Sequence, residues 1–231
     1  MNDFNISIYS LLIQHFIDKE TIQKIKAGTI LFQEKDKVEH VYILLSGSIV
    51  LGRLHPTGKE FTLKILTGEE ILVEYQLFKP SPRYLFYAKA MTDCEVFMID
   101  RDKFEQFILE DSHRLSTMTS WLSTRYLKAQ MKCQDLIING KKGGLYSILN
   151  RLANSYGVMT DKGILIDLPL THQELANLTF GTREVIQRLL KELREKNIIT
   201  YERQKITINN LNYLKAEVDC QNCPYEICGL N

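Results

Sequence analysis

Three cysteines near the C-terminus have the residue type and the spacing of a metal-binding group. Cys220, Cys223 and Cys228 form a C-x2-C-x4-C pattern in an extension that we assign to residues 214–231. The first two are spaced so that one tight turn can direct both sulfurs at a common metal centre. Two centres fit such thiols: a structural zinc ion, which composition alone favours, and a [4Fe–4S] cluster. A reactive tail without metal is the third interpretation.

The bulk properties of the chain limit what the other residues can do. The sequence has 231 residues, enough for two small domains, and its net charge is only +1, so any DNA-binding surface must be local. The N-terminus has neither a basic start nor a cleavage site, and the longest apolar run, residues 41–45, is too short to span a bilayer. We therefore expect a cytoplasmic protein that does not contact a membrane. In that reducing compartment a cysteine cluster more often binds metal or does redox chemistry than forms a disulfide.

The first half of the chain predicts a β domain followed by a long helix. Residues 28–98 alternate apolar and polar residues in short runs separated by turn signals, which is typical of an antiparallel β domain, and we assign this domain residues 1–110. A helical pattern then runs from about residue 101 to 138. Within it, apolar residues recur at every seventh position: Leu115, Leu122, Ala129 and Leu136. We interpret residues 111–138 as a dimer-forming helix, with a helix packed on its own β domain as the alternative, and Asn139-Gly140 as the hinge that ends it.

The second half predicts a winged helix-turn-helix, to which we assign residues 139–213. Thr171 is a good N-cap, and Glu174 three residues later completes a capping box, so a short helix begins there. Residues 179–181 interrupt this helix, and Thr182 can cap a second one. The stretch YERQKITINNLNYL then has the pattern of the bulk of a two-strand hairpin, which would form the wing.

The second helix of this pair leaves polar side chains on its outer face near its N-terminal end: Arg183, Glu184, Gln187 and Arg188. A recognition helix enters the major groove by its N-terminal residues, where arginine can bond guanine bidentately and glutamate can accept from cytosine. Together with the capping residues Thr171 and Thr182, these four form the predicted DNA-binding set. The alternative is the solvated face of an ordinary amphipathic helix. Nearby basic residues could add phosphate contacts: Lys141, Lys142, Arg203 and Lys205.

The order of a β domain, a long helix and the stretch LTHQELANLTFGTREVIQRLLKELREKNII resembles the Crp/Fnr family of bacterial transcription regulators over essentially the whole chain. The resemblance implies an α+β fold, with an antiparallel β-roll of the cyclic-nucleotide-binding type, a dimerisation helix and a winged helix-turn-helix. It also implies a homodimer that binds an inverted repeat in double-stranded DNA and works with RNA polymerase. The family's Arg-Glu-x-x-x-Arg pattern falls on Arg183, Glu184 and Arg188. This match implies a TGTGA-like half-site, with the arginines on guanines and Glu184 on a cytosine of the complementary strand, while Gln187 lies where relatives vary.

The resemblance does not extend to nucleotide binding. Cyclic-nucleotide binders of the family use a Gly-Glu-Leu motif followed closely by Arg-Ser. Here Val73 precedes Glu74 in place of the glycine, and the stretch around Arg83 does not place an arginine and a small hydroxyl residue in register. A β-branched residue hinders the close approach of the backbone to a phosphate. We therefore expect no cyclic AMP binding, and we interpret Glu74 and Arg83 as ordinary surface charge.

The stretches NGKKGGLYSILNRL and CQNCPYEIC resemble the oxygen-sensing Fnr regulators of Gram-positive bacteria, which carry their cluster cysteines at the C-terminus. This resemblance implies a [4Fe–4S] cluster, rather than zinc, on Cys220, Cys223 and Cys228. Other Fnr proteins hold their cluster at the N-terminus, and this chain departs from them because it has no cysteine before Cys94.

A [4Fe–4S] cluster needs a fourth ligand that the tail does not offer. The candidates are Cys94, Cys133, Asp135, a histidine or a small molecule. Cys94 lies in a strand-like segment and fits a buried small hydrophobe, and packing beside the apolar stripe explains Cys133. Asp135 lies off that stripe in the last turn of the predicted helix, where a carboxylate gains nothing from the helix dipole. We predict Asp135 as the fourth ligand and Cys133 as the second choice; an ordinary exposed aspartate is the alternative.

These patterns together predict an oxygen-responsive transcription regulator of anaerobic metabolism, acting as an activator under the control of a [4Fe–4S] cluster. The alternative is a small-ligand-responsive Crp-like activator whose tail is held by zinc. An enzyme is not expected, because the sequence has one three-cysteine motif, scattered histidines and no phosphate loop, Ser-His-Asp set or paired carboxylates.

Overall fold

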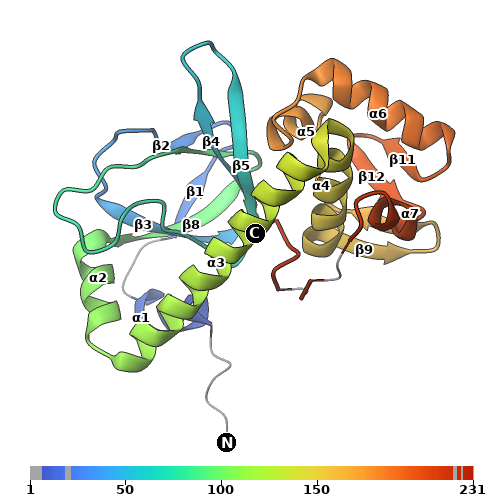
Figure 1. The fold of residues 1–231 in the computed structure, drawn as a ribbon. Coiled ribbons are helices and arrows are strands. Elements are labelled where there is room, and N and C mark those ends of the chain that lie inside the picture. The colour runs from blue at the N-terminus through green and yellow to red at the C-terminus, as the bar shows by residue number, and fades with distance from the viewer. Residues whose placement is uncertain (1–6, 19–21, 221–222, 225, 231) are drawn as a thin grey trace, which may run out of the picture. The chain divides into compact units, whose positions relative to one another are not determined.

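The computed structural model describes residues 7–18, 22–220, 223–224 and 226–230. The chain divides into two compact units, residues 1–123 and 124–231, and the helix α3 (Ser112–Ile138) runs across the division. Antiparallel sheets fill the first unit, and helices with a small sheet form the second (Figure 1). The predicted α+β fold class, with a β-roll, a long helix and a winged helix-turn-helix, is confirmed.

The N-terminal unit is built on two four-stranded antiparallel sheets, ordered β1-β8-β3-β6 and β2-β7-β4-β5. Its strands are β1 (Ile22–Ile25), β2 (Ile30–Phe32), β3 (His40–Ser46), β4 (Ser48–Leu54), β5 (Glu60–Thr67), β6 (Glu70–Leu72), β7 (Tyr87–Ala90) and β8 (Cys94–Asp100). Apolar side chains from both sheets, from α1 (Ile8–Phe16) and from α2 (Arg101–Leu109) form one buried cluster. Gly47 turns β3 into β4 at a φ of 88°, and a Cβ there would collide with the Asp93 carbonyl, so the turn requires glycine.

The helix predicted to run unbroken from residue 101 to 138 is two helices, α2 and α3, separated by residues 110–111. The Asp111 carboxylate accepts hydrogen bonds of 2.7 Å from the His113 amide and 3.4 Å from the Arg114 amide. These bonds satisfy amides that have no partner within the first turn of a helix, so Asp111 starts α3 as a new element. The predicted end of the helix is correct, because α3 stops at Ile138, just before the Asn139-Gly140 break.

The C-terminal unit combines helices with a small antiparallel sheet of order β11-β12-β10-β9. Its elements are α4 (Gly140–Tyr156), β9 (Gly157–Thr160), β10 (Gly163–Ile166), α5 (His172–Leu178), α6 (Arg183–Glu195), β11 (Ile199–Glu202), β12 (Lys205–Ile208) and the short α7 (Leu211–Ala216). Every residue of α4 from Gly143 to Ala153 is buried, so α4 is the central helix of the unit.

The capping prediction for the helix-turn-helix is confirmed at both helices. Thr171 and Glu174 form a complete capping box at the start of α5, and the Thr182 hydroxyl accepts a 3.4 Å bond from the Val185 amide at the start of α6. Phe180 lies between the two helices with a φ of 51°, which makes the tight turn. In the wing, Arg203 and Gln204 both have positive φ, the conformation that matches the twist of a two-residue hairpin.

Candidate metal centre and nucleic-acid interface

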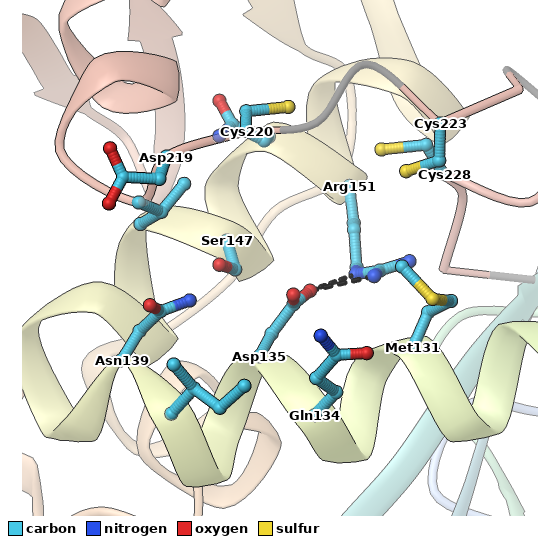
Figure 2. A pocket seen from close by; sticks show the side chains of 13 residues that line it. Met131, Gln134, Asp135, Asn139, Ser147, Arg151, Asp219, Cys220, Cys223 and Cys228 are labelled. Atoms are coloured by element: carbon cyan, nitrogen blue, oxygen red, sulfur yellow. Dashed lines mark hydrogen bonds and ion pairs between the residues drawn. The ribbon is translucent and has the colours of Figure 1, made fainter.

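The three tail cysteines and Asp135 line one cavity of about 260 Å³ inside the C-terminal unit. The volume of the cavity is several times the ~30 Å³ that one water molecule occupies in the liquid. Figure 2 shows Cys223 and Cys228 next to each other, with Asp135 reaching in from α3. Residues 221, 222 and 225 of the cysteine motif lie outside the described part of the chain.

The thiols surround the cavity without converging on one point. Among the described residues, no three side chains of histidine, cysteine, aspartate or glutamate are close enough together to hold a single metal ion. A single zinc ion needs four ligands at about 2.0–2.3 Å, whereas the ligands of an iron–sulfur cube bind different iron atoms and lie further apart.

Asp135 is not the simple exposed aspartate of the alternative interpretation, because it forms an ion pair with Arg151 of α4. The Nη2 and Nε atoms of Arg151 lie 2.6 and 3.0 Å from the same carboxylate oxygen, Oδ2 (Figure 2). The Arg151 side chain is only 3% exposed and that of Asp135 is 24% exposed. Sequence reasoning missed Arg151, since nothing near it in the chain marks it as the partner of a residue on another helix.

The loop that carries Cys228 is fixed to α4 through its main chain. Arg151 Nη1 lies 3.3 Å from the carbonyl oxygens of both Ile227 and Gly229. Asn154 Nδ2 donates to the Cys228 carbonyl at 2.7 Å, and the Leu230 amide donates to Ser155 Oγ at 2.8 Å. The main-chain atoms of four consecutive tail residues, 227–230, thus bond side chains on one face of α4.

The electrostatic surroundings of Cys228 hold its thiol in the protonated form. Burial raises the pKa of the Cys228 thiol, and the adjacent Cys223 thiol raises it further, whereas the charge of Arg151 opposes the rise. Metal binding to such thiols must displace protons, since the ligand is the thiolate.

A buried polar atom beside the cavity has no partner among the described residues. Asn150 is 5% exposed and lines the cavity, and its Oδ1 atom accepts no hydrogen bond there. An unpaired buried amide is costly, and an amide can present its N–H groups instead when it turns about its last bond. N–H donors to sulfur are part of the usual surroundings of iron–sulfur centres. With three thiols, a carboxylate and this amide, the residues present fit an iron–sulfur cluster.

The remaining candidate ligands lie elsewhere. Cys94 is buried in β8 of the N-terminal unit, and its Sγ donates to the Ser48 carbonyl at 3.4 Å. Cys133 is exposed on α3 and is not among the residues that line the cavity, although it is only two positions from Asp135.

The candidate DNA-reading residues share the outer face of α6. All of Arg183, Glu184, Gln187 and Arg188 are exposed, while Ile186, Leu189, Leu190 and Leu193 are buried on the inner face. The Glu184 carboxylate accepts hydrogen bonds from its own backbone amide and from the Thr182 hydroxyl. These bonds hold the pKa of Glu184 below its usual value. Glu184 is therefore a ready hydrogen-bond acceptor at the N-terminal end of the helix. Thr171, by contrast, is engaged in its own capping box.

Three of the basic residues proposed for phosphate contacts have partners within the protein. Lys141 donates to the Phe180 carbonyl, Lys142 pairs with Glu217 at 2.7 Å, and Lys205 pairs with Asp167 at 2.5 Å. Their first role in this structure is thus to join elements of the C-terminal unit.

The apolar stripe of α3 is largely uncovered in the single chain. Leu115 is 39% exposed and Leu122 is 38% exposed, and Met118 is the one buried residue of the 27 in the helix. A helix that packed along its own β domain would bury this stripe, so the exposure favours a surface for a second chain.

The residues compared with the nucleotide-binding motif make contacts within the N-terminal unit. Val73 is buried, and Glu74 pairs with Lys64 at 2.5 Å with side-chain exposures of 10% and 16%. Glu74 is therefore not ordinary surface charge as interpreted from the sequence. Arg83 is exposed and donates to the Lys35 carbonyl at 2.8 Å.

Family models match both units. The model of the cyclic nucleotide-binding domain matches residues 22–111, and that of the Crp-like helix-turn-helix domain matches residues 145–217.

Among the described residues, no helix has both the length and the apolar character needed to cross a membrane.

Comparison with individual proteins gives similarity along most of the chain. This chain is 40% identical over 212 residues to the anaerobic regulatory protein of Bacillus subtilis, and the match covers 91% of this chain and 89% of that one. It is 30% identical over 190 residues to the global nitrogen regulator of Synechococcus elongatus, with coverages of 82% and 86%. A mutant CooA from Carboxydothermus hydrogenoformans has a similar fold, with a TM-score of 0.76 at 20% identity over 93% of this chain and 96% of that one.

Proposed function

Since this chain belongs to the Crp/Fnr family of DNA-binding transcription regulators, which act as dimers and are not enzymes, we propose that it is an oxygen-responsive regulator of anaerobic metabolism. In this proposal a [4Fe–4S] cluster held by Cys220, Cys223 and Cys228 controls its binding to DNA. The name of the Bacillus subtilis relative, an anaerobic regulatory protein, supports the anaerobic role. Transcription in bacteria takes place in the cytoplasm, so the proposal also places the protein there.

The observation that carries the proposal is the meeting of the three tail thiols with Asp135 around one cavity. These four residues come from two segments far apart in the sequence, the end of α3 and the tail. Bound there, the cluster would supply sensitivity to oxygen, because oxidation destroys iron–sulfur centres. Asp135 would be the fourth ligand, and a carboxylate is a harder ligand than a thiolate, so it would leave iron more readily.

The Asn139-Gly140 break connects the cysteine site with the helices that would bind DNA. Asp135 is three residues before the end of α3, and the Asn139-Gly140 break separates it from α4, which supports the helix-turn-helix. A ligand set that joins Asp135 to the tail fixes the chain on both sides of this break. Release of Asp135 would free the break and shift the population away from the arrangement that binds DNA.

For the DNA itself, we propose a TGTGA-like inverted repeat. Arg183 and Arg188 would contact guanines, Glu184 would accept from a cytosine, and Gln187 would adjust the choice of sequence. The exposure of all four side chains on one face of α6, near the helix N-terminus, supports this assignment. RNA polymerase would be the partner of the bound dimer.

The decisive experiment is purification without oxygen, followed by measurement of iron, sulfide and visible absorption. We expect a coloured protein with about four iron and four sulfide per chain, which loses its colour in air. Cys223→Ser should lose the colour, and Cys133→Ser, which changes a cysteine outside the cavity, should keep it. Colourless, iron-free wild-type protein that binds its DNA at full strength would disprove the proposal.

The match to the cyclic nucleotide-binding domain favours a second candidate, a small-ligand-responsive activator whose tail holds zinc. In that case the protein purified without oxygen would be colourless, with about one zinc per chain. Its DNA affinity would then respond to a small molecule in the N-terminal unit rather than to air.

A further inference from the structure

Arg151 is a charged side chain in an unusual position, 3% exposed on the central helix of the C-terminal unit. A guanidinium rarely lies so deep unless a counter-charge and hydrogen-bond acceptors surround it. Its acceptors come from two other segments, Asp135 near the end of α3 and the carbonyls of Ile227 and Gly229. The buried cation thus joins the end of α3, α4 and the loop around Cys228.

The contacts to the loop are made by the planar fork of the guanidinium. Nη1 is directed at the two carbonyls that flank Cys228, while Nη2 and Nε are directed at Asp135. An arginine presents these donors in fixed directions at once, whereas a lysine presents one charged centre. Asn154 and Ser155 extend the same row of anchors by binding Cys228 and Leu230. None of these bonds needs a metal.

The charge of Arg151 is equally suited to the site. Three thiolates and a carboxylate carry four negative charges, which the positive core of an iron–sulfur cluster would offset only in part. The negative charge that remains is costly to bury unless a cation such as Arg151 lies beside it. A cation beside an iron–sulfur centre also favours the reduced, more negative state, so it raises the reduction potential.

From these contacts we propose that Arg151 is the positioning residue of the tail site. Its fork holds the Cys228 loop and Asp135 in place whether or not a metal is bound, and its charge tunes the centre once one is bound. The cluster is therefore assembled on a preformed scaffold and can be rebuilt without refolding of the tail. This inference rests on the proposed function for the identity of the bound group, but its claim about the metal-free protein does not.

The metal-free claim is tested by hydrogen exchange of the full-length apoprotein, followed by mass spectrometry of peptides from the tail and from α6. Arg151→Met removes the fork and the charge, and Arg151→Lys keeps the charge alone. Arg53→Met is the matched control, because Arg53 pairs with Glu34 at 2.9 Å but lies in the N-terminal unit. We expect tail exchange to become at least tenfold faster in both Arg151 variants and to stay unchanged in the control, with α6 protected throughout.

Tail protection within twofold of wild type in Arg151→Met would overturn the proposal. If Arg151→Met also loses the protection of α6, the whole unit has unfolded and Arg151→Lys decides. If Arg151→Lys loses protection from exchange in the tail but keeps it in α6, the result supports the role of the guanidinium fork. If the tail of Arg151→Lys stays fully protected, the result contradicts that role.

The charge claim is tested on protein reconstituted with iron and sulfide without oxygen. We expect the reduction potential to shift downward in Arg151→Met and to return close to the wild-type value in Arg151→Lys. The lysine variant therefore separates the two roles, since it restores the potential and leaves the tail unprotected. Equal potentials in wild type and Arg151→Met would contradict the electrostatic role. Wild-type protein that takes up no iron would instead refute the proposed function, while the exchange result for the apoprotein would still stand.

Discussion

Lys141 Nζ donates a 2.7 Å hydrogen bond to the carbonyl oxygen of Phe180. Lys141 belongs to the first turn of α4, directly after the Asn139-Gly140 break, and Phe180 makes the turn between the two helices that would meet DNA. The bond therefore links the start of α4 to the helix-turn-helix itself. It also stabilises a non-glycine residue at positive φ, a conformation that costs about 1–3 kcal/mol.

The first prediction concerns this bond. Lys141→Gln should lower the stability of the apoprotein by about 1 kcal/mol, since it removes a charged donor to a carbonyl. The salt dependence of DNA binding should not change. If Lys141 is instead a phosphate contact, as the sequence suggested, the slope of log affinity against log salt should fall by about 1. Thermal unfolding and a salt titration of DNA binding separate the two outcomes.

The second prediction concerns the fourth ligand. Asp135→Ala should abolish anaerobic activation and lower the iron content, while the dimer remains. Asp135→Cys should restore the cluster, because a fourth thiolate replaces the carboxylate, and the restored centre should lose its colour in air more slowly than wild type. Visible absorption after exposure to air measures both effects. Normal activation of Asp135→Ala would remove Asp135 from the ligand set, and a loss in Cys133→Ser would then point to Cys133.

The third prediction concerns the reading face of α6. Arg183→Ala and Arg188→Ala should each weaken binding to a TGTGA inverted repeat by about 1–3 kcal/mol per half-site and should relax the preference for guanine. The matched control is Lys191→Ala, because Lys191 lies on the same helix, pairs with Glu195 at 3.7 Å and is 73% exposed. Fluorescence anisotropy with wild-type and single-base-changed DNA provides the comparison. Equal losses in all three variants would indicate a general charge effect rather than base reading.

The fourth prediction concerns the exposed stripe of α3. Leu122→Glu should raise the dimer dissociation constant at least about tenfold, because a leucine buried between chains contributes about 1.5–3 kcal/mol. Leu54→Glu is the control, since Leu54 is 60% exposed on β4. Sedimentation equilibrium gives the association state of each variant. A dimer of unchanged strength in Leu122→Glu would place the interface elsewhere.

The fifth prediction concerns pH. Burial, with the charges of Arg183 and Arg194, holds the pKa of His172 below its usual value, so the unfolded chain binds this proton more readily than the folded one. Stability should therefore be complete above about pH 6.5 and should decline as the pH falls below it. Thermal unfolding of the apoprotein at about pH 7.5 and pH 5.5 should show a larger loss for wild type than for His172→Gln. An equal loss in both proteins would exclude His172 as the cause.

Features encoded by neighbouring residues were predictable from the sequence. The capping box of Thr171 and Glu174 and the end of α3 at the Asn139-Gly140 break depend on contacts within a few positions, and both are present. The break between α2 and α3 was missed although its cause is local, because the apolar periodicity continues across Asp111 and concealed its capping role.

The contacts that assemble the candidate site could not be predicted in this way. Arg151 lies 16 positions after Asp135 and 76 before Ile227, and its partners include main-chain oxygens, which leave no trace in residue type. The same holds for Glu74, whose pairing with Lys64 depends on the geometry of the folded β domain. Motifs identified the candidate ligands, but only the packing of α4 against the tail revealed what holds them.

The anchoring of the tail through main-chain atoms has a consequence for how such a sequence can diverge. Since α4 holds Ile227, Cys228, Gly229 and Leu230 through backbone oxygens and an amide, these hydrogen bonds do not depend on which side chains those residues carry. A descendant of this chain could therefore exchange the Ile227 side chain and keep the bond from its carbonyl oxygen to Arg151. Selection would instead register at the polar residues of α4, far from the motif by which the site is recognised.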